Sequence, residues 1–332
     1  MMKKIKKYAF KIIGLFFFFA FAFYIFSWYG IPERGFTRYG VTFSTVMARQ
    51  LGLDPRETYD AIVDDLGVRL IRLPVYWSDI EPEEGTYAFS DYDYFFKKAE
   101  EKRVQLIPVI GRKLPRWPEC FIPSWAGNIE GDRLDEAVRR QMQIVVERYR
   151  NSPAVIRWQI ENEPFHVYGA ECAKTKLSPA IVDEEITLVR SLDAHPIMLT
   201  DSGEQGIWSS SLRRAEYLGI STYYQVWNGV LRVVRFPFGP GFYRAKARLF
   251  TLFYPDKKIV VSELQAEPWG PGLLPYVQLD FQLRLMDEVR FREIIRRARL
   301  AGFEENILWG AEWWYWLKTK QNNNGMWNEA KK

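Results

Sequence analysis

The chain has 332 residues and a formal charge of +5, from 46 Lys and Arg against 41 Asp and Glu. Residues 1–32 hold five of the basic side chains and no acidic one, so residues 33–332 are balanced at 41 of each sign. A neutral body lacks the basic stripe of a nucleic-acid-binding domain, and 48% hydrophobic residues exclude an acidic disordered chain. We therefore expect no nucleic-acid partner and a large folded domain over 33–332.

An uncharged apolar run occupies residues 12–28, directly after the lysines. As a helix it would rise roughly 25 Å, near the short end of what crosses a bilayer. No small-residue cleavage pattern follows, which favours an uncleaved membrane anchor over residues 1–32; a cleaved signal peptide is the alternative. The lysines would stay in the cytoplasm, so the domain would be extracytoplasmic, or secreted if the leader is removed.

Short apolar runs and amphipathic segments then alternate along the body. Strands are predicted at 39–43, 68–75, 104–110, 155–160, 197–200, 217–223, 258–262 and 306–310. Helices are predicted at 55–67, 91–103, 132–149, 179–192, 209–215, 243–253, 289–300 and, as a short tail, 326–332. Eight such units in about 300 residues predict a (β/α)8 TIM barrel. A doubly wound open sheet is the alternative, but the glycine-rich nucleotide motifs typical of it are absent from the sequence.

Two glutamates lie at the ends of predicted strands. The fourth strand ends in Asn162-Glu163-Pro164, and Glu263 follows Ser262 on the seventh. In a closed eight-stranded barrel these ends face each other across the mouth, where active sites of this fold lie. Cleavage of a glycosidic bond requires such a pair, one carboxyl protonated and the other ionised. The plainer alternative is a loop carboxylate and an ion-pair partner.

The segment that begins at Arg72, RLPVYWSDIEPEEGTYAFSDYD, adds a second pattern. Together with the Asn-Glu-Pro triplet and Glu263 it resembles the retaining glycoside hydrolases of clan A, the family 5 cellulase-like enzymes and families 39 and 42 above all. The resemblance extends from about Tyr39 to Trp316. It implies double displacement on a β-linked sugar, with Glu163 as general acid/base, Glu263 as nucleophile and a carboxyl separation of about 5–5.5 Å.

The resemblance also implies roles for residues around the two glutamates. Arg72 would keep the nucleophile ionised, and Asn162 would bind the sugar 2-hydroxyl. A tyrosine on the sixth strand would donate to the nucleophile, and Tyr223 fits, with Tyr224 as the one-residue alternative. Each of these side chains has a plainer interpretation, because an interior arginine needs an acidic partner wherever it lies and a tyrosine often only packs.

Aromatic residues and a histidine complete the expected substrate site. A tryptophan after the eighth strand would form the floor under the sugar, and Trp313 or Trp314 in GAEWWYW fits that implication. Trp269 lies in the loop after the seventh strand, where its flat face could stack on a sugar ring. His166 follows Glu163 by three residues and could line the cleft. A core tryptophan and a loop histidine are the alternatives.

The loop after the third strand departs from the resemblance. Arg112 and Lys113 stand there, which indicates either an acidic sugar or different packing. Cys120 in this loop and Cys172 in the next are the two cysteines of the chain. The two loops are neighbours on one face of a barrel, so a disulfide is possible; two free thiols are the alternative.

These observations predict a monomeric, membrane-anchored glycosidase that binds carbohydrate and needs no cofactor or metal. Two widely separated histidines and no HExxH argue against a metallohydrolase, and no G-x-S-x-G argues against a serine hydrolase. A non-catalytic carbohydrate-binding barrel and a transglycosylase that acts on cell-envelope glycan are the alternative functions.

Overall fold

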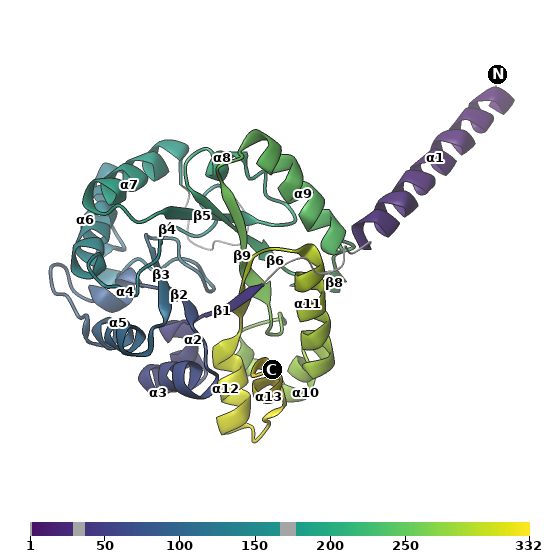
Figure 1. The fold of residues 1–332 in the computed structure, drawn as a ribbon. Helices are drawn as coiled ribbons and strands as arrows, with labels where there is room; N and C mark the ends of the chain where they lie inside the picture. Colours follow the sequence, from purple (N-terminus) through teal and green to yellow (C-terminus); the bar gives the residue numbers. More distant parts are fainter. Residues whose placement is uncertain (1, 29–36, 167–176) are drawn as a thin grey trace.

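The computed structural model describes residues 2–28, 37–166 and 177–332. Eight parallel strands close into a barrel in the order β1-β10-β9-β6-β5-β4-β3-β2 (Figure 1). The strands are β1 (Arg38–Thr42), β2 (Leu70–Pro74), β3 (Gln105–Ile110), β4 (Trp158–Ile160), β5 (Ile197–Ser202), β6 (Tyr217–Thr222), β9 (Lys258–Gln265) and β10 (Glu305–Trp309). The predicted (β/α)8 TIM barrel is confirmed, with each strand within about three residues of its expected bounds.

Helices surround the barrel on its outside (Figure 1). They include α3 (Pro55–Asp60), α5 (Ser90–Lys102), α6 (Asp132–Tyr149), α7 (Pro179–Leu192), α8 (Ser209–Leu212), α9 (Pro240–Phe253), α11 (Glu288–Ala301) and α13 (Gly325–Ala330). Helix α7 has the predicted bounds because its start is encoded locally: Ser178 caps the backbone N–H of Ile181, and Pro179 occupies the first turn.

The chain also forms elements that the sequence pattern did not reveal. They are α2 (Thr45–Gln50), α4 (Trp77–Ile80), α10 (Leu279–Leu285), α12 (Ala311–Lys320) and an antiparallel hairpin of β7 (Gln225–Asn228) and β8 (Arg232–Arg235). Helix α12 corrects the expectation that a short helical tail at 326–332 is all that follows the eighth strand. Strand β10 ends at Trp309, and Gly310, with φ 132°, turns the chain directly into this helix.

The barrel interior changes character along its axis. The part nearer the N-terminal ends of the strands is filled by an apolar layer of Leu70, Ile107, Met198, Val260 and Ile307. Because side chains two residues apart on a strand share a face, Arg72 follows Leu70 into the interior one step closer to the strand ends. The apolar layer therefore packs directly beneath the polar groups at the mouth, the C-terminal end of the barrel.

Helix α1 (Met2–Trp28) leads away from the barrel and ends beside α9 (Figure 1). Its Phe23 ring meets Phe238 and Phe242 edge to face, at centroid distances of 6.4 and 6.1 Å. Among the helices of the described ranges, none has both the length and the apolar character needed to cross a membrane. The membrane anchor remains a prediction. The expected boundary at residue 32 lies outside the described residues.

Candidate active site

Glu263 stands on β9 where the pairing with β6 shifts by one residue. Ile220 is opposite Val261, but the next residue, Ser221, is opposite Glu263. The carboxylate accepts two charge-stabilising hydrogen bonds: Oε1 from the Arg72 guanidinium at 2.8 Å and Oε2 from the Tyr223 hydroxyl at 2.9 Å. The two contacts hold the Glu263 carboxylate in one orientation at the mouth.

Arg72 is completely buried and uses all three guanidinium nitrogens. Nε donates to the Gln159 side-chain oxygen at 2.7 Å, Nη2 to Asn162 Oδ1 at 2.7 Å, and Nη1 to Glu263. A buried cation needs such partners, since an unpaired one would cost several kcal/mol. Arg72 thereby fixes Glu263 and also sets the Asn162 amide, whose oxygen faces the arginine and whose NH2 group points the other way.

Tyr223 lies just after β6, as expected, and contacts Glu263. Its neighbour Tyr224 does not reach the carboxylate: its backbone N–H donates to Gln265, and its ring packs 6.2 Å from that of Tyr243. Tyr223 is in turn held by Glu204, which accepts its backbone N–H at 2.9 Å. The Tyr243 hydroxyl donates to the same Glu204 oxygen. Nothing in the sequence pointed to Glu204, because it belongs to a loop after β5 and its role depends on these distant contacts.

Glu163 follows β4 in the left-handed region, with φ 43°, which is uncommon for a residue with a side chain. Its backbone N–H donates to the Thr200 hydroxyl at 2.7 Å, and its Oε1 accepts from the Ser221 hydroxyl at 2.8 Å. Ser221 is the residue directly opposite Glu263 in the sheet. Both glutamates therefore lie beside Ser221 of β6: Glu163 through the hydrogen bond and Glu263 as its partner in the sheet.

The electrostatic surroundings of Glu163 differ from those of Glu263. Burial raises the pKa of Glu163 to about 8, and the negative charges of Glu263 and Glu119 act in the same direction. Lys113 and the Ser221 hydrogen bond oppose the shift only in part. At neutral pH Glu163 is thus mostly protonated. The site pairs a proton donor with a carboxylate that accepts from Arg72 and Tyr223.

Glu119 is a third carboxylate at the mouth, one that the sequence did not single out. Its Oε1 accepts from the Asn162 Nδ2 at 3.0 Å, and its Oε2 lies 3.4 Å from Lys113 Nζ. Burial raises its pKa, and the Glu263 charge contributes. It belongs to the long loop after β3, where no strand or helix period predicts which way a side chain points.

The two basic residues of that loop are neutralised within the protein. Arg112 pairs with Asp135 at 2.6 Å on the side of the helices. Lys113 is 1% exposed and donates to the Glu163 carbonyl at 2.9 Å. These contacts correct the idea that the pair marks a site for an acidic sugar, and support the alternative of different packing.

Trp313 is corrected by the structure. It belongs to α12, has no exposed surface, and donates from Nε1 to Gln282 at 2.7 Å. Trp314 is equally buried and donates to the Ala266 carbonyl. The tryptophan at the end of the eighth strand is Trp309. The prediction failed because the residues after β10 form helix α12, which turns Trp313 and Trp314 into the core.

Trp309 borders a buried ionic cluster at the mouth. Its Nε1 donates to Glu267 at 2.9 Å, and the Arg116 guanidinium lies 4.1 Å over its ring. Arg116 also binds Glu312 at 3.0 Å. One face of the indole is thus covered by a cation that two carboxylates neutralise, and 7% of the residue remains exposed.

The remaining predicted residues lie around the mouth. Trp269 is 45% exposed, with its ring edge-on to Tyr223 at 5.0 Å, so it stands at the entrance beside that tyrosine. His166 is partly buried, and its backbone N–H donates to the Glu163 carbonyl at 3.0 Å. Cys120 is disulfide-bonded, in agreement with the predicted bridge; Cys172 lies outside the described residues.

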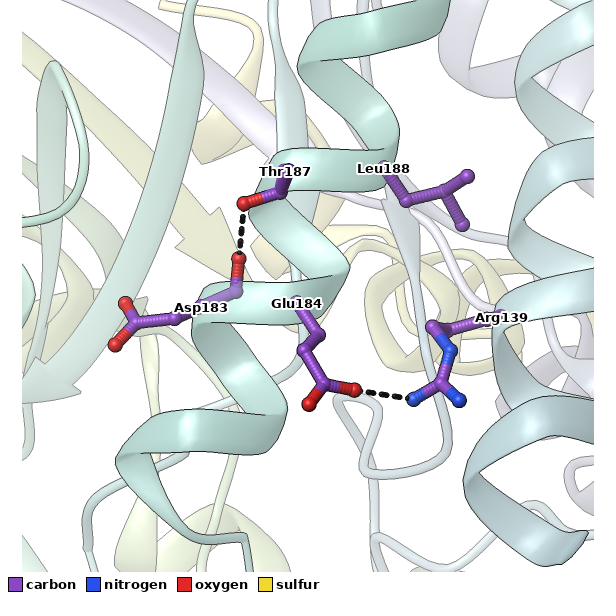
Figure 2. Close-up of a pocket in the computed structure, with 5 residues that line it drawn as sticks. All are labelled: Arg139, Asp183, Glu184, Thr187 and Leu188. Carbon is purple, nitrogen blue, oxygen red and sulfur yellow. Dashed lines mark hydrogen bonds and ion pairs between the residues drawn. The ribbon is translucent and has the colours of Figure 1, made fainter. Parts of the chain in front are cut away.

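Away from the mouth, the described ranges offer little that resembles a second site. No three His, Cys, Asp or Glu side chains gather there as a metal ion would need. A surface depression is present between α6 and α7 (Figure 2). Its lining consists of Arg139, Asp183, Glu184, Thr187 and Leu188, and Arg139 pairs with Glu184 at 2.7 Å. It belongs to the outer helices and contains neither mouth glutamate.

Known proteins similar in sequence match only part of the chain. No protein-family profile matches it. A β-galactosidase of Bacillus subtilis is 31% identical over 114 residues, which are 29% of this chain and 16% of that protein. A mannan endo-1,4-β-mannosidase of Podospora anserina is 29% identical over 121 residues, 33% of this chain and 31% of that protein. The matched part is thus less than about a third of each relative.

Solved structures match over most of the chain at low identity. A β-galactosidase of Halorubrum lacusprofundi superimposes with a TM-score of 0.58 at 15% identity, over 82% of this chain and 52% of its own. A xylanase of Thermotoga maritima has a TM-score of 0.57 at 13% identity, over 82% of both chains. These likenesses establish the shared barrel fold, and with the sequence relatives they confirm the predicted resemblance to clan A glycoside hydrolases.

Proposed function

We propose that the protein is a retaining β-glycosidase in which Glu163 is the general acid/base and Glu263 the nucleophile. The observation that carries the proposal is the contrast between the two carboxyl groups. Glu263 is held by Arg72 and Tyr223, whereas burial and neighbouring carboxylates raise the pKa of Glu163 to about 8. Two carboxyl groups with opposite protonation on either side of a scissile bond are what double displacement needs.

The first step transfers the Glu163 proton to the leaving-group oxygen while Glu263 Oε attacks the anomeric carbon. The glycosidic C–O bond breaks and a glycosyl ester forms. Esterification removes the negative charge of Glu263, one of the causes of the raised pKa of Glu163. Glu163 has lost its proton in the first step and now acts as the base. It accepts a proton from water, and the water oxygen attacks the anomeric carbon. The glycosyl ester bond to Glu263 breaks and the sugar leaves with retained configuration.

The substrate class proposed is a β-linked oligo- or polysaccharide. The relatives and structural neighbours include enzymes named for β-galactosides, mannan and xylan, and this supports the β-linkage without selecting one sugar. The half-exposed Trp269 beside Tyr223 offers an aromatic face at the entrance. We also propose that residues 1–32 tether the barrel to a membrane on its extracytoplasmic side, on the grounds of the lysine cluster and apolar run alone.

The test is hydrolysis of 4-nitrophenyl β-glycosides of galactose, glucose, mannose and xylose, with β-mannan and xylan as polymers. We expect the wild-type protein to cleave at least one of them and Glu263→Ala to cleave none. Proton NMR of the first product should show the β-anomer. An α-anomer as first product, or equal rates for wild type and Glu263→Ala, contradicts the proposal.

A further inference from the structure

Glu119 is placed at the mouth by a rigid turn. It adopts a left-handed backbone conformation, φ 62°, and its backbone N–H donates to the Arg116 carbonyl at 2.7 Å. The next residue, Cys120, is disulfide-bonded. A non-glycine residue in this region costs about 1–3 kcal/mol and persists where the surroundings impose it. The loop is therefore built to present this side chain in one position.

The carboxylate of Glu119 has unused hydrogen-bonding capacity. Oε1 accepts from Asn162, but Oε2 is buried and accepts no hydrogen bond from any residue in the described ranges; Lys113 Nζ lies 3.4 Å away. An ionised carboxylate can accept about four hydrogen bonds. The side chain of Glu119 is 18% exposed, whereas that of Lys113 is 1% exposed. Because Oε2 itself is enclosed, Oε1 is the oxygen through which a molecule bound at the mouth would meet the glutamate, and the lysine beneath it stays covered.

Asn162 offers a complementary donor next to it. Its Oδ1 is taken by Arg72, which fixes the amide, and one Nδ2 hydrogen points to Glu119. An amide NH2 carries two hydrogens, and among the residues that the structure describes only Glu119 accepts from this one. A donor on Asn162 and an acceptor on Glu119, side by side, match a sugar hydroxyl, which accepts one hydrogen bond and donates another.

We propose that Glu119 is a substrate-binding residue that accepts a hydrogen bond from a sugar hydroxyl while Asn162 donates to the same ring, so that the site selects an uncharged sugar. This inference rests on the proposed function. Hydrogen bonds to an ionised acceptor are stronger than neutral ones, and the same charge repels a carboxylate on the substrate. The loop whose Arg112 and Lys113 suggested an acidic sugar thus presents a negative group instead.

A purely structural role would look different. If Glu119 only neutralised Lys113, its replacement would lower stability and affect every substrate alike. If it binds a hydroxyl, replacement affects substrates that carry this hydroxyl and spares the analogue that lacks it. The comparison between substrates therefore separates the two roles, even where the variant is somewhat less stable.

The experiment uses the full chain as wild type, Glu119→Gln, Glu119→Ala and the control Glu136→Gln, which removes one charge from the exposed side of α6. The probes are the 4-nitrophenyl β-glycoside that the wild type cleaves, its 2-, 3-, 4- and 6-deoxy analogues, and its uronic-acid counterpart. We expect kcat/KM of the parent glycoside to fall about 10- to 100-fold in both Glu119 variants and to stay unchanged in the control. For one deoxy analogue, wild type and Glu119→Gln should react equally.

The uronic-acid substrate provides the second readout. Its kcat/KM relative to the parent glycoside should rise at least about 10-fold in Glu119→Gln, because the repelling charge is gone. Equal losses on the parent and on every deoxy analogue would overturn the inference while leaving the glycosidase intact. If the wild type cleaves no glycoside, the proposed function fails. Calorimetric titration with the parent sugars then decides the binding role: equal affinity of wild type and Glu119→Gln overturns it.

Discussion

Two groups of charged residues, here called the wall cluster and the mouth cluster, lie at the C-terminal end of strand β4, and the hydrogen bonds of their carboxyl groups differ. The wall cluster contains Glu161, which accepts from the backbone N–H of Arg112 at 2.9 Å and of Lys113 at 2.6 Å. The mouth cluster contains Glu163, only two residues later, whose side chain accepts from one hydroxyl, that of Ser221. Glu161 is fully buried and Glu163 partly buried, and both have a raised pKa, chiefly through desolvation.

The difference lies in what holds each group. Glu161 fits a cradle of fixed backbone donors and lies so close to Gly111 that a Cβ there would come within 2.3 Å of its carboxyl carbon. Glu163 instead accepts from Ser221, the residue opposite Glu263 in the sheet, and the charges of Glu263 and Glu119 act on it. Burial and a shifted pKa alone therefore do not identify a catalytic acid; its position beside the second carboxylate of the mouth does.

The largest effect should come from the mouth, at Glu263. Glu263→Ala removes the nucleophile, and we expect kcat to fall at least about 10⁴-fold. Urea unfolding should show that the fold survives. Azide added to this variant should restore cleavage of a 4-nitrophenyl glycoside with inverted product. Substantial residual turnover without azide would show that the two clusters were assigned wrongly.

A smaller effect is expected for Glu163→Gln. Loss of the acid/base should lower kcat about 10²- to 10⁴-fold on substrates with poor leaving groups. Glycosides of 2,4-dinitrophenol need no proton for departure, so their first step should be nearly as fast as in the wild type. Pre-steady-state release of the phenol measures that step. A uniform loss on both substrate types would argue against the acid/base role.

A substitution in the wall cluster should lower the stability of the protein and leave its catalytic activity unchanged. Gly111→Ala forces a Cβ against Glu161 at a backbone angle of φ 134°, and we expect the free energy of unfolding to fall by about 3 kcal/mol. Activity divided by the folded fraction should stay within about twofold of the wild type. The measurement is urea unfolding alongside the glycosidase assay. A large loss of activity per folded molecule would show that the wall cluster also contributes to catalysis.

The dependence of kcat/KM on pH tests the protonation of Glu163 in the mouth cluster. The acid must be protonated to act, and its pKa of about 8 predicts that kcat/KM is maintained at neutral pH and falls as pH rises through about 8. Glu119→Gln removes one of the charges that raise this pKa, so the alkaline limb should move to lower pH. Glu136→Gln should leave the limb where it is. An unmoved limb in Glu119→Gln would mean that Glu119 does not influence the acid.

Among the residues that contact or form the glutamate pair, the smallest loss of activity is expected for Tyr223→Phe, which deletes one hydrogen bond to Glu263 and leaves the ion pair with Arg72 in place. A hydrogen bond to a charged group contributes about 1.5–3 kcal/mol, so kcat/KM should fall about 10- to 100-fold. Tyr224→Phe is the matched control one residue away and should leave kcat/KM unchanged. Equal effects of the two variants would contradict the assignment of Tyr223.

The amino-acid sequence by itself determined the barrel and the pairing of Arg72 with Glu263. Strands and helices follow from local periodicity and caps, and residues at strand ends inherit their position from the barrel closure, which is why Glu163 and Tyr223 could be located in advance. Only the tertiary structure decided the loops. Glu119 acquires its neighbours from the ends of strands β3 and β4, and Arg112 turns outward to Asp135. Trp313 lies in the core because α12 packs there and Gln282 accepts its Nε1–H. These outcomes depend on contacts between distant segments, which no local pattern contains.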